Sequence, residues 1–150
     1  MKKLLSLLLV TVVLTGCGSN SLKEGTYEGT AVDTFGGQEN TATAKVTIDA
    51  NGKITDVYLD TTYTKDGVET TKKTLGNDYG MKETSADKGV IEGGAEWFEQ
   101  VEALEQAVID NQGIDFLNVD EDGYTDAVSK CTIKVDALYK ALEAALNKAK

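Results

Sequence analysis

The fold is decided by residues 46–59, VTIDANGKITDVYL, in which two alternating runs flank a turn. Val46 and Ile48 alternate with polar residues before the turn, and Ile54 and Leu59 belong to the run that follows it. Alternation with many β-branched residues is typical of half-buried strands. The Asn-Gly pair between the runs is the signal of a tight hairpin. The stretch therefore predicts two consecutive antiparallel strands.

The same pattern extends from this hairpin in both directions. Upstream, Tyr27 and Val32 lie among polar residues from Gly25 onward. Downstream, Lys65-Asp66-Gly67 repeats the turn signal one strand later. Gly36-Gly37 fits either a plain turn or a place where the backbone approaches a ligand. We expect an antiparallel sheet in the first half of the chain.

The second half of the chain changes to helical spacing. Apolar residues spaced by four, three and four positions predict an amphipathic helix that ends near Gly113; they are Trp97, Val101, Leu104 and Val108. Residues 114–119 then predict a short strand, and Asp120-Glu121-Asp122-Gly123 predicts a β-turn. This acidic turn does not match an EF-hand calcium loop, which has Gly at its sixth position and Glu at its twelfth. Counted from Asp120, these positions hold Thr125 and Cys131.

A closing helix follows, with Asp136 as its expected N-cap. Its apolar stripe contains Leu138, Leu142 and Leu146, filled in by Ala141, Ala145 and Ala149. The order of strands, helix, strand and helix predicts an α+β fold, an antiparallel sheet with helices packed on one side.

The N-terminus has the outline of a secretory signal peptide. A short positive start precedes an apolar run that is too short to span a membrane. The run ends in Leu14-Thr15-Gly16-Cys17, which resembles the bacterial lipobox, in which the cysteine is acylated. An ordinary cleaved signal peptide with a free Cys17 is the alternative. We expect a signal peptide at 1–16, a flexible tether at 17–24 and a domain at 25–150, lipid-anchored on the extracellular side of the cell membrane.

Composition excludes several classes of protein. The 150 residues, 41% of them hydrophobic, suffice for one domain. A formal charge of -10 argues against a nucleic-acid partner. Because the chain has no His and only two Cys, His-dependent hydrolysis, Cys-His proteolysis and His-ligated metal catalysis are ruled out.

Two single residues allow two interpretations each. Cys131 could be a redox centre, or a small buried hydrophobe with no basic neighbour except Lys130. Trp97 could stack on a ligand, or serve as a core aromatic. Residues 126–132, DAVSKCT, group hydroxyls and one acid ahead of the last helix, where an anion such as a phosphate is favoured; ordinary helix capping is the alternative.

These seven residues resemble the flavinylation motif of FMN-binding domains, Asp-x-x-Ser/Thr-Gly-Ala/Cys-Ser/Thr, whose last hydroxyl residue carries FMN through a phosphoester. Such domains occur in the C subunit of the sodium-pumping NADH:quinone oxidoreductase and in Gram-positive lipoproteins of extracellular electron transfer. Other segments are similar to the lipoprotein branch, so that the resemblance covers 25–146: GTYEG at 25–29, ITDV at 54–57, YGM at 79–81, EWFEQ at 96–100 and DGYTD at 122–126.

The resemblance implies roles for named residues. Thr132 would be the attachment point, with Asp126, Ser129 and Cys131 as its motif partners. Lys130 departs from the family, which has Gly there; its side chain would strain the loop, obstruct the transferase or pair with the flavin phosphate. The residues expected to pack against the isoalloxazine are Tyr79, Met81 and Trp97.

The implied function is that of a membrane-anchored electron carrier, because the flavin supplies the redox chemistry. Its partners would be a flavin transferase, the membrane through the lipid anchor, and a quinone-linked electron donor or an extracellular acceptor. Neighbouring acids would lower the flavin's potential. The alternative is a flavin-free lipoprotein of the same fold that acts as an interaction module or as the source of a signal-peptide pheromone.

Overall fold

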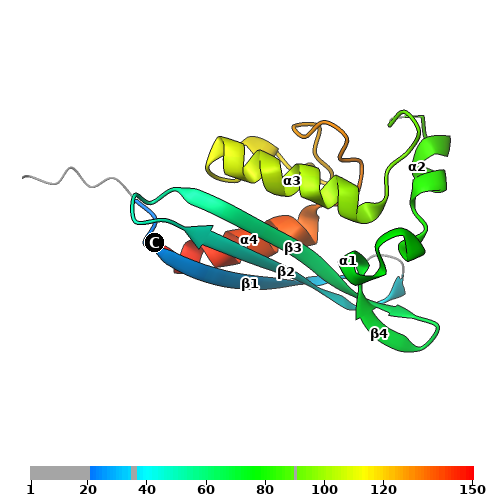
Figure 1. Ribbon diagram of the computed structural model, residues 1–150, viewed down its shortest axis with the longest axis horizontal. Coiled ribbons are helices and arrows are strands. Elements are labelled where there is room, and N and C mark those ends of the chain that lie inside the picture. Colours follow the sequence, from blue (N-terminus) through cyan, green and yellow to red (C-terminus); the bar gives the residue numbers. More distant parts are fainter. Residues whose placement is uncertain (1–20, 35–36, 90) are drawn as a thin grey trace, which may run out of the picture.

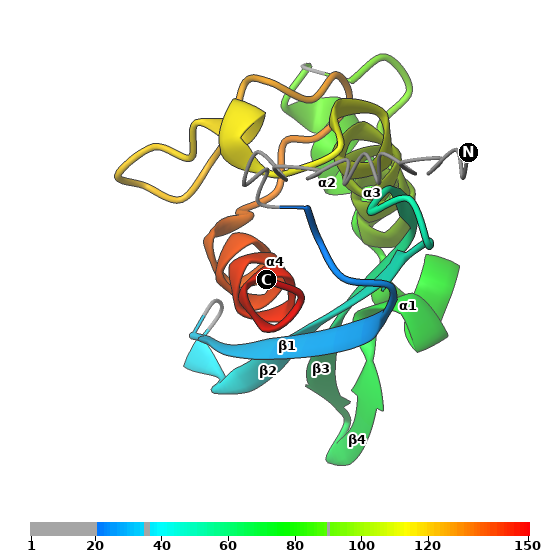
Figure 2. The same ribbon diagram turned by 90° about the vertical axis from the view of Figure 1, so that its left-hand side faces the viewer.

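The computed structural model describes residues 21–34, 37–89 and 91–150, and it has the predicted α+β fold. The elements in chain order are the strands β1 (Gly25–Asp33), β2 (Asn40–Ile48), β3 (Ile54–Lys65) and β4 (Val68–Thr71), then α1 (Lys72–Leu75), the 3-10 turn η2 (Gly76–Tyr79), α2 (Lys82–Asp87), α3 (Trp97–Asn111), the 3-10 turn η3 (Asp115–Leu117) and α4 (Asp136–Lys148). The strands form one antiparallel sheet in the order β1-β2-β3-β4 (Figure 1). Figure 2 shows α3 and α4 on the same side of the sheet, α4 over β1 and β2 and α3 over β3.

Two predicted features lie outside the described residues, namely Cys17 with its signal peptide and Gly36 of the Gly36-Gly37 pair. Within the described ranges, none of the helices has the length and apolar character needed to cross a membrane.

The hairpin predicted at 49–53 joins β2 to β3. Asp49 Oδ1 accepts hydrogen bonds from the backbone N–H groups of Asn51 and Lys53, both at 2.9 Å. The bond from Lys53 is the largest reason that the pKa of Asp49 lies below its usual value. Gly52 takes a φ of 74°, which the tight turn requires. The stretch that decides the sheet therefore folds as predicted.

The second predicted turn, between β3 and β4, is also confirmed. Asp66 and Gly67 both have positive φ, 52° and 79°. Two successive residues with positive φ match the right-handed twist of the flanking strands.

Very close packing joins β1 to α4 at Gly29. A Cβ on this residue would overlap the Ala141 carbonyl oxygen and the Ala145 backbone nitrogen, so only glycine fits. Ala141 and Ala145 are fully buried, and the leucines of the predicted stripe, Leu138 and Leu142, are buried beside them. The closing helix is thus confirmed.

The predicted N-cap of α4 is wrong by one residue. Val135 occupies the N-cap position and Asp136 is the first helical residue. The carbonyl oxygen of Gly123 accepts hydrogen bonds from the N–H groups of Val135 at 2.7 Å and Asp136 at 3.2 Å. A backbone carbonyl therefore replaces the side-chain cap, and Asp136 pairs instead with Lys140 at 2.8 Å.

α3 begins and ends where the spacing predicts, with a capping box formed by Glu96 and Glu99 at its start. The strand predicted at 114–119 is wrong, because this segment forms η3. Ile114 and Leu117 are both buried and lie three residues apart, which is the period of a 3-10 turn and not of a strand. The turn predicted at 120–123 is confirmed by the bond from the Gly123 N–H to the Asp120 carbonyl at 3.0 Å.

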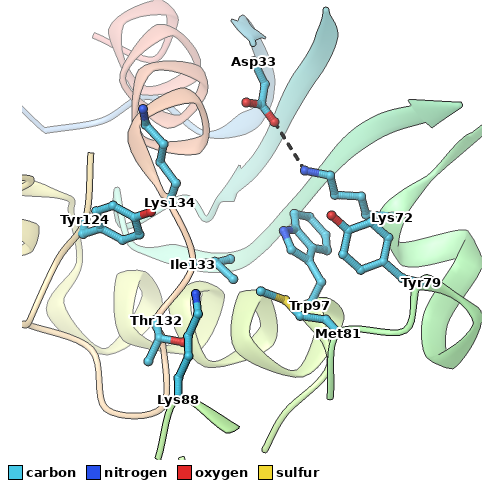
Figure 3. Close-up of a pocket in the computed structure, with 10 residues that line it drawn as sticks. All are labelled: Asp33, Lys72, Tyr79, Met81, Lys88, Trp97, Tyr124, Thr132, Ile133 and Lys134. Atoms are coloured by element: carbon cyan, nitrogen blue, oxygen red, sulfur yellow. Dashed lines mark hydrogen bonds and ion pairs between the residues drawn. The ribbon is translucent and has the colours of Figure 1, made fainter. Parts of the chain in front are cut away.

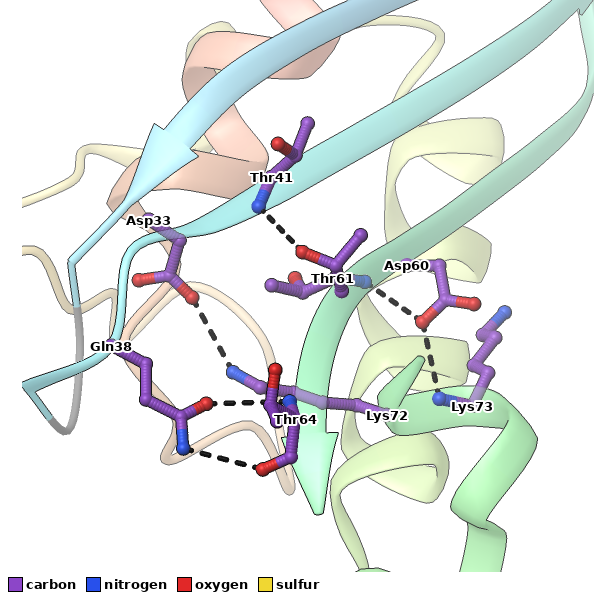
Figure 4. A network of polar contacts seen from close by, with 9 residues as sticks. Asp33, Gln38, Thr41, Asp60, Thr61, Thr64, Lys72 and Lys73 are labelled. Atoms are coloured by element: carbon purple, nitrogen blue, oxygen red, sulfur yellow. Dashed lines mark hydrogen bonds and ion pairs between the residues drawn. The ribbon is translucent and has the colours of Figure 1, made fainter. Parts of the chain in front are cut away.

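A cluster of polar groups ties α1 and α3 to β3. Glu105 Oε1 accepts hydrogen bonds from the Leu59 N–H and from Lys73 Nζ, both at 2.5 Å. We call Leu59, Lys73 and Glu105 the frame cluster. Burial is the main cause that raises the pKa of Glu105. Asp60 Oδ1 adds bonds from the N–H groups of Thr61 at 2.8 Å and Lys73 at 3.1 Å (Figure 4). The start of α1 is thereby held in one place.

Candidate functional site

A pocket opens between α1, the N-terminal end of α3 and the segment before α4 (Figure 3). Its enclosed volume is about 50 Å³, and the open space at its mouth brings the total to about 420 Å³. The lining residues are Asp33, Lys72, Tyr79, Met81, Lys88, Trp97, Tyr124, Thr132, Ile133 and Lys134. The pocket thus brings together predicted site residues from three separate parts of the sequence, namely Tyr79, Met81, Trp97 and Thr132.

Gln100 of α3 fixes Thr132 in the pocket wall. The Thr132 N–H donates to Gln100 Oε1 at 2.8 Å, and the Thr132 hydroxyl donates to the same oxygen at 3.1 Å. Gln100 is fully buried, and its Nε2 donates to the Ala95 carbonyl at 3.2 Å. Both ends of the amide are therefore bonded, and its orientation is determined. The Thr132 hydroxyl is the donor in this hydrogen bond, so the lone pairs of its oxygen are not used in it.

Buried Glu96 holds the segment that contains Tyr79 and Met81 against the start of α3. Its Oε2 accepts a hydrogen bond from the Met81 N–H at 2.8 Å, and its Oε1 accepts one from the Lys82 N–H at 3.2 Å. The Met81 sulfur in turn lies 3.9 Å from Gln100 Nε2. Residues far apart in sequence are thus joined by hydrogen bonds to one turn of α3.

Lys72 is a buried cation on the pocket wall, with a relative exposure of 5%. Its Nζ lies 3.4 Å from Asp33 Oδ2, 5.3 Å from the ring centroid of Trp97 and 5.8 Å from that of Tyr79. Figure 3 shows the ammonium between the Asp33 carboxylate and the two rings. Burial, with smaller effects from Tyr63 and Asp33, raises the pKa of Tyr79 to about 12. Tyr79 is therefore a neutral phenol at physiological pH.

The pocket is positively charged although the chain is acidic. Lys88 and Lys134 are exposed at its mouth and Lys72 lies inside, whereas Asp33 is the one carboxylate among the described lining residues. Lysines therefore outnumber carboxylates in this lining, in contrast with the neighbouring acids expected from the sequence. The start of α4 contributes little positive charge, because the Gly123 carbonyl already accepts bonds from its first N–H groups.

The rest of the motif forms a turn beside the pocket. The Cys131 N–H donates to the Val128 carbonyl at 3.2 Å, and Lys130, third in this turn, has a φ of 64°. This is the left-handed region that favours glycine, the residue that the resemblance assigns to this position. Asp126, Ser129 and Lys130 are exposed, and Ser129 and Lys130 border a separate hollow beside Glu99. Of the motif's predicted site residues, Thr132 is the one that the structure brings into the pocket.

The two residues with open interpretations both lie in the hydrophobic core. Cys131 has a relative exposure of 6%, and burial raises the pKa of its thiol to about 11. It is therefore a protonated thiol at neutral pH, which fits the small buried hydrophobe. Trp97 has a relative exposure of 4% and the Lys72 ammonium over its ring, so it forms part of the wall and offers no open face for stacking.

Sequence reasoning missed Gln100, Lys72, Asp33, Lys88 and Lys134. Gln100 did carry a signal, because it lies three residues after Trp97 on the apolar face of α3, where a polar side chain needs a buried partner. The lysines could not be recognised from the sequence as site residues, since short Lys runs also occur on solvated faces.

Comparison with protein-family models, with curated proteins and with solved structures gave no significant match. In the described part of the chain, no group of three or more His, Cys, Asp or Glu side chains could hold a metal ion. The function must therefore be argued from the site itself.

Proposed function

We propose that this protein is a lipid-anchored electron carrier that holds FMN on Thr132 through a phosphoester. The observation that carries the proposal is the hydroxyl of Thr132, held by buried Gln100 at the edge of a pocket with aromatic walls and three ammonium groups. Flat aromatic ligands bind between apolar and aromatic side chains, and phosphates bind beside lysines. This combination of groups fits FMN.

The residues divide between the two ends of such a ligand. Lys88 and Lys134 would neutralise the phosphate next to Thr132, while Tyr79 and Met81 would contact the ring. Bound FMN would supply electron transfer, which no side chain here provides. The positive φ of Lys130 adds support, because this backbone conformation favours glycine, the residue that the FMN-binding family has at the matching position.

Attachment needs an external enzyme. The Thr132 hydroxyl donates to the Gln100 amide oxygen, which is not basic enough to remove its proton. We expect a flavin transferase with FAD as donor. Thr132 Oγ1 would bond to the phosphorus on the flavin side of the pyrophosphate, the bond to the bridging oxygen would break, and AMP would leave with the hydroxyl proton. Gln100 would hold the hydroxyl in position for this step.

The lipid anchor at Cys17 and a covalent cofactor suit the same location. A dissociable cofactor on the extracellular side of the membrane would be lost by dilution, whereas a bonded one remains. The electrons would come from a quinone-linked donor in the membrane or go to an extracellular acceptor.

Coexpression of the full chain with a flavin transferase tests the proposal. After denaturing electrophoresis, the wild-type band should fluoresce under ultraviolet light and the Thr132→Ala band should not. Ser129→Ala is the matched control, because Ser129 is an exposed hydroxyl of the same motif outside the pocket. Equal fluorescence of Thr132→Ala would contradict the attachment site. A dark wild-type band would favour the flavin-free alternative.

A further inference from the structure

The chain enters the folded domain at one end of the sheet. Leu22 packs against the hydrophobic core, and the Lys23 N–H donates to the Ala149 carbonyl at 2.8 Å. β1 begins two residues later, next to the turn between β2 and β3. The domain is therefore held from Leu22 onward, and five Cα-to-Cα steps separate this residue from Cys17.

The pocket beside Thr132 lies at the opposite end of the same elements. Asp33 is the last residue of β1, and Lys134 comes just before α4, whose C-terminal end lies at the point of entry. The nine residues of β1 span about 27 Å, at roughly 3.4 Å per step. Figure 1 shows the start of β1 and the C-terminus at one end of the domain and α1 at the other. The length of β1 therefore separates the pocket from the tether.

Resting on the proposed function and its lipid anchor, we propose that the electron partner of this pocket is a water-soluble molecule of the extracellular space, and that quinones within the bilayer do not reach the pocket. For the pocket end to face the bilayer, Leu22 would have to stand about 27 Å above it. The five steps from Cys17 reach at most about 18 Å, at about 3.6 Å each, whatever their conformation. The anchor therefore keeps the pocket end away from the membrane.

The long sides of the domain offer the bilayer little to bind. Glu102 and Asp110 are exposed along the outer side of α3, and an anionic leaflet repels carboxylates. The exposed positions of β1 on the other side of the sheet include Thr26, Glu28 and Thr30. Binding in the plane of a membrane needs a large apolar face, which neither of these surfaces has.

The open mouth of the pocket suits a dissolved partner. About 50 Å³ of the space is enclosed, so a ring attached at Thr132 would remain mostly in the mouth, in contact with water. Oxidation of the reduced flavin passes two electrons to one two-electron acceptor or to two one-electron acceptors, and its two protons go to the surrounding water. The partner therefore needs no channel into the protein.

Energy transfer in vesicles tests the orientation without any flavin. The lipidated full chain carries a donor dye on Lys53→Cys, at the entry end, or on Lys134→Cys, at the pocket mouth, and the lipids carry the acceptor dye. Both lysines are exposed, whereas Cys131 is a buried, protonated thiol that does not take the label. Transfer should be several-fold stronger from position 53 than from position 134. Equal transfer from the two positions would overturn the proposal.

Oxidation rates of the flavin-loaded, chemically reduced chain in the same vesicles test the partner. The matched variant carries ten Gly and Ser residues inserted after Asn20, which extends the reach of the tether to about 54 Å. The insertion should raise the rate of oxidation by a quinone in the bilayer by about tenfold or more, because a tether that cannot span the distance allows almost no contact. Ferricyanide in the water should oxidise both proteins at the same rate. A quinone rate that the insertion leaves unchanged would overturn the proposal. A protein that loads no flavin, or that the vesicles do not hold, overturns the proposed function instead.

Discussion

Two pairs of polar residues, each with one member on α1 and one on α3, differ in what surrounds them. In the frame cluster, Glu105 of α3 meets Lys73 of α1 and the Leu59 N–H. At the pocket, Gln100 of α3 meets Thr132, and Lys72 of α1 meets Asp33. Lys72, Gln100 and Glu105 are buried, and Lys73 is half-buried.

The difference lies in the remaining space. The polar groups of the frame cluster bond to one another, and none of its residues lines the pocket beside Thr132. The Lys72 ammonium and the Thr132 hydroxyl border open space as well as their partners. Burial of polar residues on α1 and α3 therefore marks a site only where a ligand can reach them, and the two pairs should respond differently to substitution.

The largest effect should come from opening the frame cluster. Lys73→Met leaves the Glu105 carboxylate buried without its cation, and we expect a loss of about 3–5 kcal/mol in the free energy of unfolding at neutral pH. Denaturant unfolding measures it. Lys140→Met removes an exposed ion pair with Asp136 and should cost less than about 1 kcal/mol.

The pH dependence sharpens this prediction. Burial raises the pKa of Glu105 above its ordinary value of 4.5, so its protonated form favours the folded state. The Lys73→Met protein should keep its stability below pH 4.5 and lose it as the pH rises through the raised folded-state pKa. A deficit that is the same at acidic and neutral pH would contradict the assigned role of the ion pair.

A smaller effect, confined to the pocket, should follow from Gln100→Met. The Thr132 hydroxyl then loses its fixed position, and the rate of flavin attachment to the folded protein should fall about tenfold, the equivalent of one lost hydrogen bond. The measurement is covalent flavin per folded protein over time. Gln106→Met, which changes an exposed residue of the same helix, should load at the wild-type rate. Equal rates of flavin attachment in the two variants would show that Gln100 does not position the Thr132 hydroxyl.

The smallest effect should come from Lys130→Gly, beside the pocket. A φ of 64° costs an L-residue roughly 1 kcal/mol or more, so glycine should raise the free energy of unfolding by about that amount. Ser129→Gly at the neighbouring position, where φ is not positive, should lower it by roughly 0.5–1 kcal/mol. Thermal unfolding of both variants measures the difference. If both substitutions changed the free energy of unfolding in the same direction, the turn would not be strained at Lys130.

The sheet could be predicted from the sequence because its signals are local. Alternation and the Asn-Gly turn act within a few residues, and so do the leucine stripe of α4 and the helical spacing of α3. The strand predicted at 114–119 was wrong because the apolar run is short and its buried residues, Ile114 and Leu117, are spaced by three, the period of a 3-10 turn. The prediction of Asp136 as the N-cap of α4 was wrong because the Gly123 carbonyl, from the preceding turn, accepts the hydrogen bonds at the start of this helix.

The site was only partly predictable for the same reason. Thr132 was predicted from a motif, whereas Lys72 and Asp33 lie 39 residues apart in the sequence and meet only in the folded chain. No spacing rule connects residues that a tertiary contact brings together. Gln100 lies between these cases, since a buried polar residue on an apolar helix face can be recognised but its partner cannot.

The covalent bond at Thr132 is tested most directly by peptide mass spectrometry of the mature protein from cells that contain a flavin transferase. The peptide with Thr132 should carry the mass of FMN less one water, with fragment ions that assign it to that residue. An unmodified Thr132 peptide, in cells where the same transferase modifies another flavoprotein, would contradict the proposed function.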